Sequence, residues 1–327
     1  MKLLIVLHHR FDLWQAPPWF AERLRRDFPQ LEVVHLHDYH RVNDEIADAD
    51  IAIAWSLRGE QITAARKLKW IHSTATAVHA LISDELRASN IVVTNARDVH
   101  GPVVAEHAMA LIFALAKRLP QAARYQQQKH WAQQHIWNAT PRPHELKGAT
   151  ITIVGLGGIG RPLAKMAGSL GMRVIGVREH PERGCEGAEK IYSYDRLDEA
   201  LAQAEFVVLA LPVTPNTQHL MNAARLARLK PEGYLVNVGR GVLIDEAALI
   251  DALRKKSFAG AALDVTTEEP LPQDSPLWTM ENVFITPHIA SLTEQMWERH
   301  YDTFTQNLRR FLSDEPLLWM VDKEKAY

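Results

Sequence analysis

The sequence predicts an α/β protein built from two doubly wound domains with parallel sheets. Short apolar runs rich in β-branched residues alternate with stretches of helical spacing along most of the chain. Strands that alternate with helices in this way form a mainly parallel sheet with helices on both faces. The length of 327 residues exceeds one typical domain and favours two, each able to bury its own core.

The first part of the chain predicts one of the two sheets. Its expected strands are residues 3–7, 31–36, 51–54, 70–73 and 91–94, and its expected helices are 19–28, 42–49, 61–68 and 82–88. A loop at 95–101 then leads into a long apolar helix at 103–119. Residues 121–143 are rich in Gln, His and Trp, and we expect them to form an exposed arm.

The second sheet is expected after Gly148. Its strands would be 151–154, 173–177, 206–209, 234–237, 261–264 and 283–286, with helices at 161–170, 197–204, 223–229 and 246–255. We expect a terminal helix at 293–312 to cross back to the first domain, with the hinge near 95–101 and 290–293. The expected domains are therefore 1–98 plus 292–327, which is discontinuous, and 99–291.

Composition excludes several classes of protein. The formal net charge is −2 and there is no long basic block, so we expect no nucleic-acid partner. The single cysteine, Cys185, excludes an intrachain disulfide framework and fits a reducing compartment. The apolar start of the chain ends at His8, too early for a signal peptide, and no run is long enough to span a membrane. We expect a cytoplasmic protein with no membrane contact.

Sixteen histidines raise the question of a metal site. His35, His37 and His40 have ligand-like spacing, but no HExxH motif or cysteine pair accompanies them. We interpret these histidines as solvated loop residues and expect no metal.

One turn in the second domain has the pattern of a dinucleotide-binding loop. The apolar run 151–154 ends in Gly155-Leu156-Gly157-Gly158-Ile159-Gly160, which matches G-x-G-x-x-G, and a helical stretch follows. In such a turn the first glycine permits a tight bend, the second lets the backbone approach a pyrophosphate, and the third lets helix and strand pack closely. The N–H groups at the start of the helix then face the phosphates. A lone match is weak evidence, but the flanking strands and helix favour a Rossmann-like nucleotide site.

The residue after the next expected strand bears on the choice of coenzyme. NAD sites usually carry Asp or Glu here for the ribose hydroxyls, whereas this chain has Arg178. A guanidinium would attract the 2′-phosphate of NADP(H), and Arg161 or Arg183 could assist. Alternatively, Glu179 binds the ribose and Arg178 faces solvent. We favour NADP(H), with NAD(H) possible.

Three ionisable side chains follow later strands of the same domain. They are Arg240, Glu269 and His288. Ligands of an open α/β sheet bind at the carboxyl ends of its strands, so we expect these side chains to converge. Each has an ordinary interpretation by itself, as a surface arginine, a solvated glutamate or a turn histidine. Together, on three strand ends of a nucleotide domain, they favour a catalytic site.

Over nearly its whole length the chain resembles the D-isomer-specific 2-hydroxyacid dehydrogenase family, in particular its NADP-preferring, glyoxylate/hydroxypyruvate reductase-like branch. The resemblance implies two Rossmann-like domains with the active site in the cleft between them; residues 99–291 would bind the dinucleotide, and 1–98 plus 292–327 the substrate. The matching segments are Val104-Ala105-Glu106-His107-Ala108-Met109-Ala110-Leu111, Gly155 to Gly160, Leu211-Pro212-Val213-Thr214-Pro215-Asn216-Thr217, Asn237-Val238-Gly239-Arg240-Gly241, Leu263-Asp264-Val265 with Glu269-Pro270, and Thr286-Pro287-His288-Ile289-Ala290.

The resemblance also implies roles for individual residues. His288 matches the general acid/base, Glu269 its carboxylate partner, and Arg240 the residue that binds the substrate carboxylate and polarises its carbonyl. The implied reaction transfers a hydride between NADP(H) or NAD(H) and carbon 2 of a small 2-oxo or 2-hydroxy acid. The implied coenzyme-binding residues are Val104, Gly155, Gly157, Gly158, Ile159, Gly160, Arg178, Leu211, Pro212, Thr217, Val238, Gly239, Asp264 and Ala290.

Residues 72–79 resemble the family loop whose backbone amides hold the substrate carboxylate. We expect Thr76 and Ala77 to bind substrate there, although the family more often has Gly and Asp where this chain has Ala77 and His79. Trp55 and Arg58 follow another first-domain strand and are expected to line the site. With Trp55 present, we expect a modest substrate without a phosphate, such as glyoxylate, hydroxypyruvate or a short branched 2-oxo acid.

Assembly and a second class of function also follow from the resemblance. It implies a homodimer formed through the nucleotide domains, with the helix from Val103 and the arm at 131–137 as contacts. Some members of the family act as nucleotide-sensing regulators with little catalysis, which is the alternative function. The presence of Arg240, Glu269 and His288 favours the enzyme.

Overall fold

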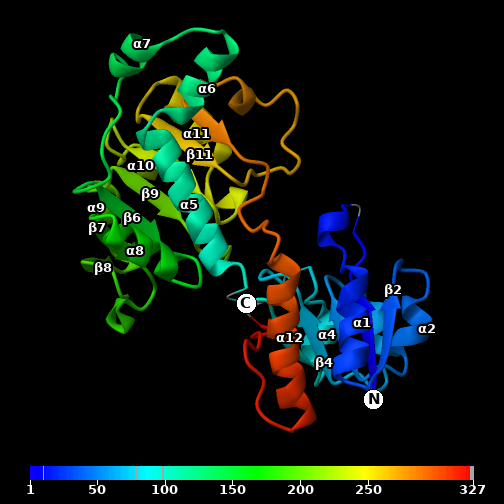
Figure 1. The fold of residues 1–327 in the computed structure, drawn as a ribbon. Coiled ribbons are helices and arrows are strands. Elements are labelled where there is room, and N and C mark those ends of the chain that lie inside the picture. The colour runs from blue at the N-terminus through cyan, green and yellow to red at the C-terminus, as the bar shows by residue number, and fades with distance from the viewer. Residues whose placement is uncertain (10, 79, 98, 325–327) are drawn as a thin grey trace. The chain divides into compact units, whose positions relative to one another are not determined.

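The computed structural model describes residues 1–9, 11–78, 80–97 and 99–324, and the chain forms two compact units (Figure 1). Unit 1 comprises Met1–Val99 and Thr293–Tyr327, and unit 2 comprises His100–Leu292. Each unit contains one sheet in which all paired strands are parallel. The predicted α/β class with two parallel sheets is confirmed.

Unit 1 holds a five-stranded sheet with the order β2-β1-β3-β4-β5. One face packs against α1 and α12, and the opposite face packs against α2, α3 and α4. The strands are β1 (Lys2–Val6), β2 (Glu32–Leu36), β3 (Ile51–Ala54), β4 (Trp70–Ser73) and β5 (Val92–Asn95). The helices are α1 (Pro18–Asp27), α2 (Val42–Ile46), α3 (Gly59–Ala64), α4 (Asp84–Ala88) and α12 (Met296–Leu312).

The segment after unit 2 completes the core of unit 1. The ring of Phe304, on α12, stacks on the fully buried Trp70 of β4 at a centroid distance of 5.3 Å. Farther along, Met320 forms an antiparallel bridge with Thr94, and the N–H of Val321 donates to the carbonyl of Val93 at 2.9 Å. The C-terminal segment is therefore an integral part of unit 1.

Unit 2 holds a seven-stranded sheet with the order β12-β11-β10-β9-β6-β7-β8. Helices α5 and α8 cover one face, and α9, α10 and α11 the other. The strand order reverses between β6 and β9, which is where doubly wound sheets bind ligands. The strands are β6 (Thr150–Val154), β7 (Arg173–Val177), β8 (Lys190–Tyr192), β9 (Phe206–Leu209), β10 (Tyr234–Asn237), β11 (Gly260–Leu263) and β12 (Val283–Ile285), and the helices are α5 (Gly101–Ala116), α8 (Gly160–Ser169), α9 (Leu197–Leu201), α10 (Ala223–Leu226) and α11 (Glu246–Arg254).

Several elements differ from the sequence-based expectation. The helix expected at 103–119 corresponds to α5, which ends at Ala116; a second helix, α6 (Leu119–Gln127), begins after Arg118, whose backbone is left-handed (φ 58°), and occupies the start of the expected arm. The expected arm also contains a short helix, α7 (Gln133–Trp137), and the three-residue strand β8 was not predicted. Short 3-10 helices occur at η1 (Asp12–Trp14), η2 (Pro181–Arg183), η3 (Tyr194–Arg196), η4 (Gly241–Leu243) and η5 (Pro276–Trp278).

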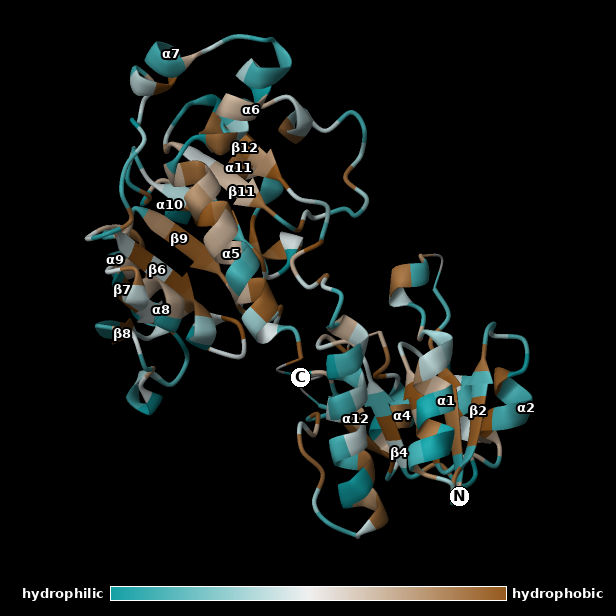
Figure 2. Ribbon diagram, in the orientation of Figure 1, coloured by the Kyte–Doolittle hydropathy of each residue, from teal (hydrophilic) through white to brown (hydrophobic). Residues whose placement is uncertain are grey.

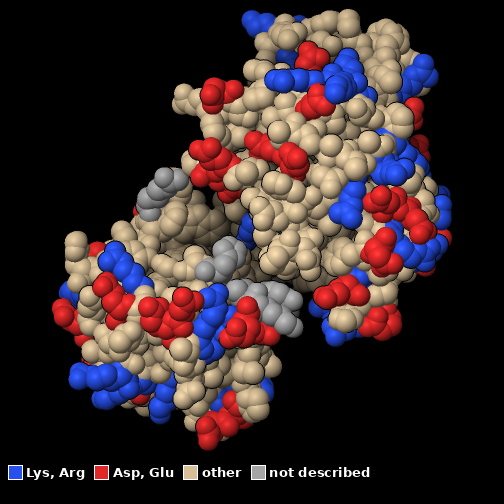
Figure 3. Space-filling model, turned by 180° about the vertical axis from the view of Figure 1, so that it is seen from behind, with Lys and Arg blue, Asp and Glu red and all other residues tan. Residues whose placement is uncertain are grey.

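The distribution of polarity follows this layering. Hydrophobic colour gathers on buried strands such as β9, whereas the side of α12 that faces the viewer is largely hydrophilic (Figure 2). On the face drawn in Figure 3, acidic and basic side chains are interspersed, in keeping with the small net charge. Among the described residues, no helix combines the length and apolarity that crossing a membrane requires.

Candidate active site

Five strands of unit 2 place their carboxyl ends at the same edge of the sheet, because they run parallel. The glycine turn follows β6, and the segment from Leu211 follows β9. Arg240 comes after β10, Asp264 after β11 and His288 after β12. Residues that are distant in sequence are thereby brought to one edge.

The glycine turn combines requirements of the fold with space for a ligand. Gly155 has a positive φ of 100°, and a Cβ there would lie 2.5 Å from the carbonyl oxygen of Ala210. A Cβ on Gly160, the first residue of α8, would lie 1.9 Å from the carbonyl oxygen of Gly155. By contrast, a Cβ on Gly157 would meet no described atom within 4 Å. The first and third glycines are therefore needed for packing, whereas the second leaves open space beside the N-terminus of α8, as a pyrophosphate requires.

His288 and Glu269 form a direct pair. Nδ1 of His288 lies 2.6 Å from Oε2 of Glu269, and Oε1 of Glu269 accepts a hydrogen bond from the N–H of Thr266 at 3.1 Å. Burial raises the pKa of Glu269, but its bonds with His288 and Thr266 and the charge of Arg240 lower that pKa below 4.5. Because an ionised carboxylate only accepts hydrogen bonds, Nδ1 carries a proton and Nε2 is left to exchange a proton with a ligand.

The His288 and Glu269 side chains remain accessible while they are paired. The His288 side chain is 45% exposed and that of Glu269 is 36% exposed. A substrate can therefore reach the imidazole, which is a requirement for a general acid or base.

The loop that carries His288 is held by a buried carboxylate. Oδ1 of Asp264 accepts hydrogen bonds from the Thr286 hydroxyl at 2.6 Å and the Ile289 N–H at 3.0 Å, and Oδ2 accepts from the Ala290 N–H at 3.1 Å. The N–H of His288 donates to the carbonyl oxygen of Asp264 at 2.8 Å. These bonds maintain the left-handed backbone of His288, whose φ is 53°. Asp264, which we expected to bind the coenzyme, is thus also a structural anchor of this loop.

Arg240 sits in a turn that Asn237 stabilises. The amide side chain of Asn237 accepts a bond from the N–H of Gly239 at 3.0 Å and donates to the carbonyl of Arg240 at 2.9 Å. Burial lowers the pKa of Arg240, and the negative charge of Glu269 opposes that change. Because arginine stays protonated well above neutral pH, this half-buried cation is suited to bind a carboxylate. Sequence reasoning did not single out Asn237, although asparagine commonly bonds its own turn in this way.

The residues expected to determine the preference for NADP(H) or NAD(H) follow β7 in the chain. Arg178 is half-buried and donates through Nη1 to the carbonyl of Gly184 at 3.0 Å. Burial raises the pKa of Cys185, and the positive charges of Arg178 and Arg161 oppose that change. Both guanidinium groups are therefore near the Cys185 thiol. Arg183 is exposed on η2. This region therefore carries three arginines, Arg161, Arg178 and Arg183, together with the exposed acidic residues Glu179, Glu182 and Glu186.

The other expected coenzyme residues of unit 2 are mostly buried apolar positions. Thr217 is 8% exposed, and its hydroxyl donates to the carbonyl of Pro212 at 2.9 Å, which holds the loop after β9 in shape. Val104, Leu211, Val238 and Ala290 are buried in the core of the same unit.

Two expected substrate residues follow β3 of unit 1. Trp55 lies edge-on to Trp14, with ring centroids 6.2 Å apart, and its buried indole N–H has no hydrogen-bond partner among the described residues. Arg58 precedes α3, and its side chain is 79% exposed. An unpartnered donor and an exposed cation are thus present after the same strand.

The loop after β4 offers free backbone donors. Within the described part of the chain, the N–H groups of Thr76 and Ala77 donate no hydrogen bond. The loop is fixed from one side, because Nδ2 of Asn95 donates to the carbonyl of Thr76 at 2.7 Å. His79 lies outside the described residues. Free N–H groups on a fixed loop are suited to bind a carboxylate.

The histidines with ligand-like spacing lie at the end of β2. The rings of His35 and His37 are 4.5 Å apart. Burial lowers the pKa of His35 to about 4, assisted by the positive charges of His37 and Arg25. Among the described residues, no three His, Cys, Asp or Glu side chains are grouped so that they could hold a metal ion.

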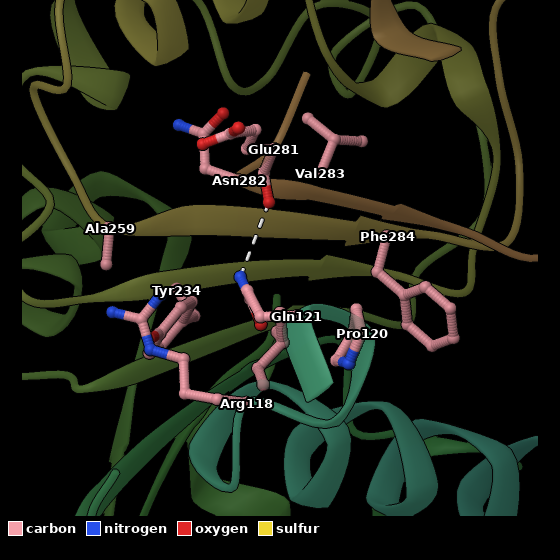
Figure 4. Close-up of a pocket in the computed structure, with 10 residues that line it drawn as sticks. Arg118, Pro120, Gln121, Tyr234, Ala259, Glu281, Asn282, Val283 and Phe284 are labelled. Carbon is pink, nitrogen blue, oxygen red and sulfur yellow. Dashed lines mark hydrogen bonds between the residues drawn. The ribbon is translucent and has the colours of Figure 1, made fainter. Parts of the chain in front are cut away.

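A small pocket lies at the opposite edge of the unit 2 sheet, where strands begin (Figure 4). It is lined by residues including Arg118, Gln121, Tyr234 and Val283, and the Gln121 side chain donates to the carbonyl of Glu281 at 3.3 Å. Its volume of about 10 Å³ holds about one water molecule. It is therefore too small for a coenzyme or an organic acid.

A parallel sheet with this glycine turn and a histidine–carboxylate pair at the same edge is the arrangement expected of an NAD(P)-dependent oxidoreductase. Residues 109–290 match the family model described as D-isomer specific 2-hydroxyacid dehydrogenase, NAD binding domain. The chain is 35% identical to the glyoxylate reductase of Pyrococcus furiosus over 267 residues, which cover 80% of this chain and 77% of that protein. The chain belongs to the D-isomer specific 2-hydroxyacid dehydrogenase family.

Solved structures agree with this assignment. A D-isomer specific 2-hydroxyacid dehydrogenase family protein from Aeromonas salmonicida superposes with a TM-score of 0.84 and 32% identity, over 98% of this chain and 99% of that chain. The NADPH-dependent glyoxylate/hydroxypyruvate reductase of Sinorhizobium meliloti, in complex with NADP and sulfate, superposes with a TM-score of 0.83 and 27% identity over 100% of both chains. The predicted family and the predicted enzyme class are confirmed.

The open space at Gly157 leads to a testable expectation. In the Gly157→Ala variant the methyl group meets no described atom, so the free energy of unfolding should change by less than about 1 kcal/mol. The methyl occupies the space into which a pyrophosphate must fit, so the Kd for NADPH should rise by about 10-fold or more. Fluorescence titration and urea unfolding measure the two quantities.

Gly168→Ala is the matched control. Gly168 lies on α8, which follows the glycine turn, and its Cβ would make an ordinary contact, 3.5 Å from the carbonyl oxygen of Gly187. Coenzyme affinity should not change in this variant. An unchanged Kd in Gly157→Ala would contradict the assignment of the turn.

Proposed function

We propose that the protein is a D-2-hydroxyacid dehydrogenase that, in the opposite direction, reduces a small 2-oxo acid, with His288 as general acid/base. The observation that carries this proposal is the 2.6 Å pair between His288 and Glu269, at the same sheet edge as Arg240 and the glycine turn. The glyoxylate reductase relatives support a substrate of this class.

The proposed roles follow from the chemistry of each side chain. A coenzyme held at the glycine turn would supply or accept the hydride at carbon 2 of the acid. For reduction, protonated His288 donates its Nε2 proton to the 2-oxo oxygen, while Glu269 holds the Nδ1–H and stabilises the imidazolium. The guanidinium of Arg240 binds the substrate carboxylate and polarises the carbonyl. In the reverse direction His288 accepts the hydroxyl proton.

We assign the remaining substrate contacts to unit 1. The unbonded N–H groups of Thr76 and Ala77 would bind the carboxylate, and Trp55 and Arg58 would line the site. A bulky indole favours a short acid without a phosphate, so glyoxylate, hydroxypyruvate and short branched 2-oxo acids are the proposed substrates.

We propose NADP(H) as the preferred coenzyme. Arg178 stands where NAD sites usually carry an acid, and Arg161 adds positive charge near the same point. The relative from Sinorhizobium meliloti is described as NADPH-dependent and was solved with NADP. Asp264, Leu211, Pro212, Thr217, Val238, Gly239, Ala290 and Val104 complete the proposed coenzyme site.

We also propose a homodimer that works in the cytoplasm. Large apolar side chains of unit 2 are exposed on α5, on α6 and along the arm: Phe113 is 38% exposed, Leu119 54%, Trp131 89% and Trp137 54%. Large exposed apolar side chains, tryptophan above all, are typical of protein interfaces, which supports the proposal. The single cysteine among 327 residues fits a reducing compartment.

Removing the catalytic pair tests the proposed reaction. His288→Asn is the suitable variant, because asparagine tolerates the left-handed backbone at this position. Its kcat with glyoxylate or hydroxypyruvate should fall by about 10²- to 10⁴-fold, while the Kd for NADPH stays within about 3-fold. A near wild-type kcat would remove His288 from the reaction. No turnover by the wild-type enzyme with any of a panel of 2-oxo acids would favour the regulatory alternative.

The same assay, run at a series of pH values, tests how the Glu269 carboxylate contributes to kcat. Because the pKa of Glu269 is below 4.5, the carboxylate stays ionised as the pH falls, and the pair is lost only when the pH drops through that lowered pKa. Glu269→Gln should therefore lower kcat by roughly 10²-fold across the whole range from about pH 5 to 8.

Arg178→Asp tests the choice of coenzyme. The change removes a cation and places a carboxylate at the position that binds the ribose hydroxyls in NAD sites. The ratio of kcat/KM for NADPH to that for NADH should fall by about 10-fold or more, mainly through KM. Arg173→Asp, at the exposed first residue of β7, is the control and should leave the ratio unchanged. A wild-type preference for NADH would refute the assignment.

Light scattering tests the assembly. The wild-type chain should have the mass of two chains, and Trp131→Ala combined with Trp137→Ala should raise the dimer Kd by at least about 100-fold, because exposed tryptophans often dominate interfaces. Trp278→Ala removes an indole of similar exposure, 51%, outside the arm and should leave the mass unchanged. A monomeric wild-type protein would refute the dimer.

A further inference from the structure

One side chain of α5 reaches the loop that carries His288. His107 is the seventh residue of α5, and its Nε2 is 3.0 Å from the hydroxyl oxygen of Thr286. The same nitrogen lies 3.4 Å from Oδ1 of Asp264. His107 therefore contacts Thr286, at the start of the loop, and Asp264, which anchors the loop, although His107 and Thr286 are 179 residues apart in the chain.

The protons in this cluster can be assigned by counting donors. Burial raises the pKa of Asp264, but its bonds with His107, Thr286, Ile289 and Ala290 lower that pKa below 3.8, so the carboxylate is ionised and only accepts. The single hydroxyl proton of Thr286 is committed to Asp264, at 2.6 Å. The Thr286 oxygen must then accept from His107, and Nε2 of His107 must carry a proton.

This arrangement ties the orientation of His288 to α5. Thr286 and Ile289 flank His288 in the chain, and both are bonded to Oδ1 of Asp264, the atom nearest to His107. Oδ2 accepts one hydrogen bond from a described residue, the Ala290 N–H, so it keeps acceptor capacity for a ligand. His107 thus restrains Asp264 at Oδ1 and makes no hydrogen bond with Oδ2, which can still accept one from a ligand.

We infer that His107 is a positioning residue whose Nε2–H fixes Thr286 and Asp264, and through them the orientation of the His288 imidazole. The inference rests on the proposed function in so far as His288 is the general acid/base. His107 itself touches neither substrate nor reacting atoms in this assignment. Its contribution is to hold the imidazole in the geometry for proton transfer, where a displacement of about 1 Å can reduce the rate by about 10²-fold.

The first test measures the tautomer and does not depend on turnover. Long-range ¹⁵N–¹H spectra of the uniformly labelled protein, assigned by loss of signal in His107→Gln and His288→Asn, should show His107 with its proton on Nε2. The His288 ring signals should shift in His107→Leu and stay near their wild-type positions in His107→Gln, because the glutamine amide keeps an N–H donor. An Nδ1–H tautomer of His107, in which Nε2 is unprotonated, would overturn the inference.

The second test compares two replacements of His107. His107→Leu should lower kcat by roughly 10- to 100-fold with KM changed by less than about 3-fold, whereas His107→Gln should retain kcat within about 3-fold. His144→Leu is the matched control, because His144 is a half-buried histidine of unit 2 packed against Phe206 and Tyr234. It should leave kcat unchanged. Equal losses in His107→Leu and His107→Gln would indicate a merely structural role and would overturn the inference.

Thr286→Val keeps the inference testable if His107→Leu does not fold. Valine has the shape of threonine without the hydroxyl, so kcat should fall to a similar extent. Thr286→Val also removes the hydrogen bond to Asp264, so in the His107→Leu/Thr286→Val double variant the loss should be smaller than the product of the two single losses, because the two substitutions disrupt a shared network. If the two single losses in kcat multiply in the double variant, the positioning role of His107 is contradicted. A wild-type enzyme that reduces no 2-oxo acid, but shows the expected tautomer and the His288 shifts, would refute only the proposed function.

Discussion

A single buried negative charge determines the shape of the candidate site. Asp264 is 3% exposed and ionised, and a buried charge without partners would destabilise the fold by several kcal/mol. The loop after β12 supplies those partners, from the Thr286 hydroxyl to the Ala290 N–H. The same set of bonds holds the left-handed backbone of His288, a conformation that few residues other than glycine adopt readily. The position of the His288 imidazole is therefore a consequence of satisfying a buried charge that lies outside the His288–Glu269 pair.

The fold and the ligand make separate demands on neighbouring residues. Gly155 and Gly160 are excluded from having a side chain by the protein's own backbone, whereas nothing in the described chain excludes one at Gly157. The carboxylates differ in a similar way: Asp264 is buried and bonded mainly to its loop, while Glu269 remains 36% exposed beside His288. Packing constraints and chemical function can thus be told apart residue by residue.

The sequence predicted the features that depend on local patterns. Buried strands such as β6 and β9 were located from their β-branched residues, and the convergence of Glu269 and His288 follows from the rule that parallel strands end at one edge. Features that depend on distant partners were not predicted. The break between α5 and α6 at Arg118 accompanies hydrogen bonds from its guanidinium to the carbonyl of Pro141, which no local pattern can show, although Pro120 at the start of α6 is a local signal for a new helix. The contact of His107 with Thr286 spans 179 residues and becomes visible only once both elements are in place.

The discontinuity of unit 1 has a consequence for how the chain is made. Its strands leave the ribosome first, but α1 covers only part of the apolar face that includes Leu3, Ile5 and Trp70. The rest is covered by Phe304 and Leu308, which follow the whole of unit 2 in the chain. Unit 2 is complete once Leu292 has been synthesised, so the later unit can finish folding before the earlier one. During that interval a nascent sheet exposes a hydrophobic face of the kind that aggregates or recruits chaperones. The part of the protein that is translated first is thus the part whose folding must wait longest.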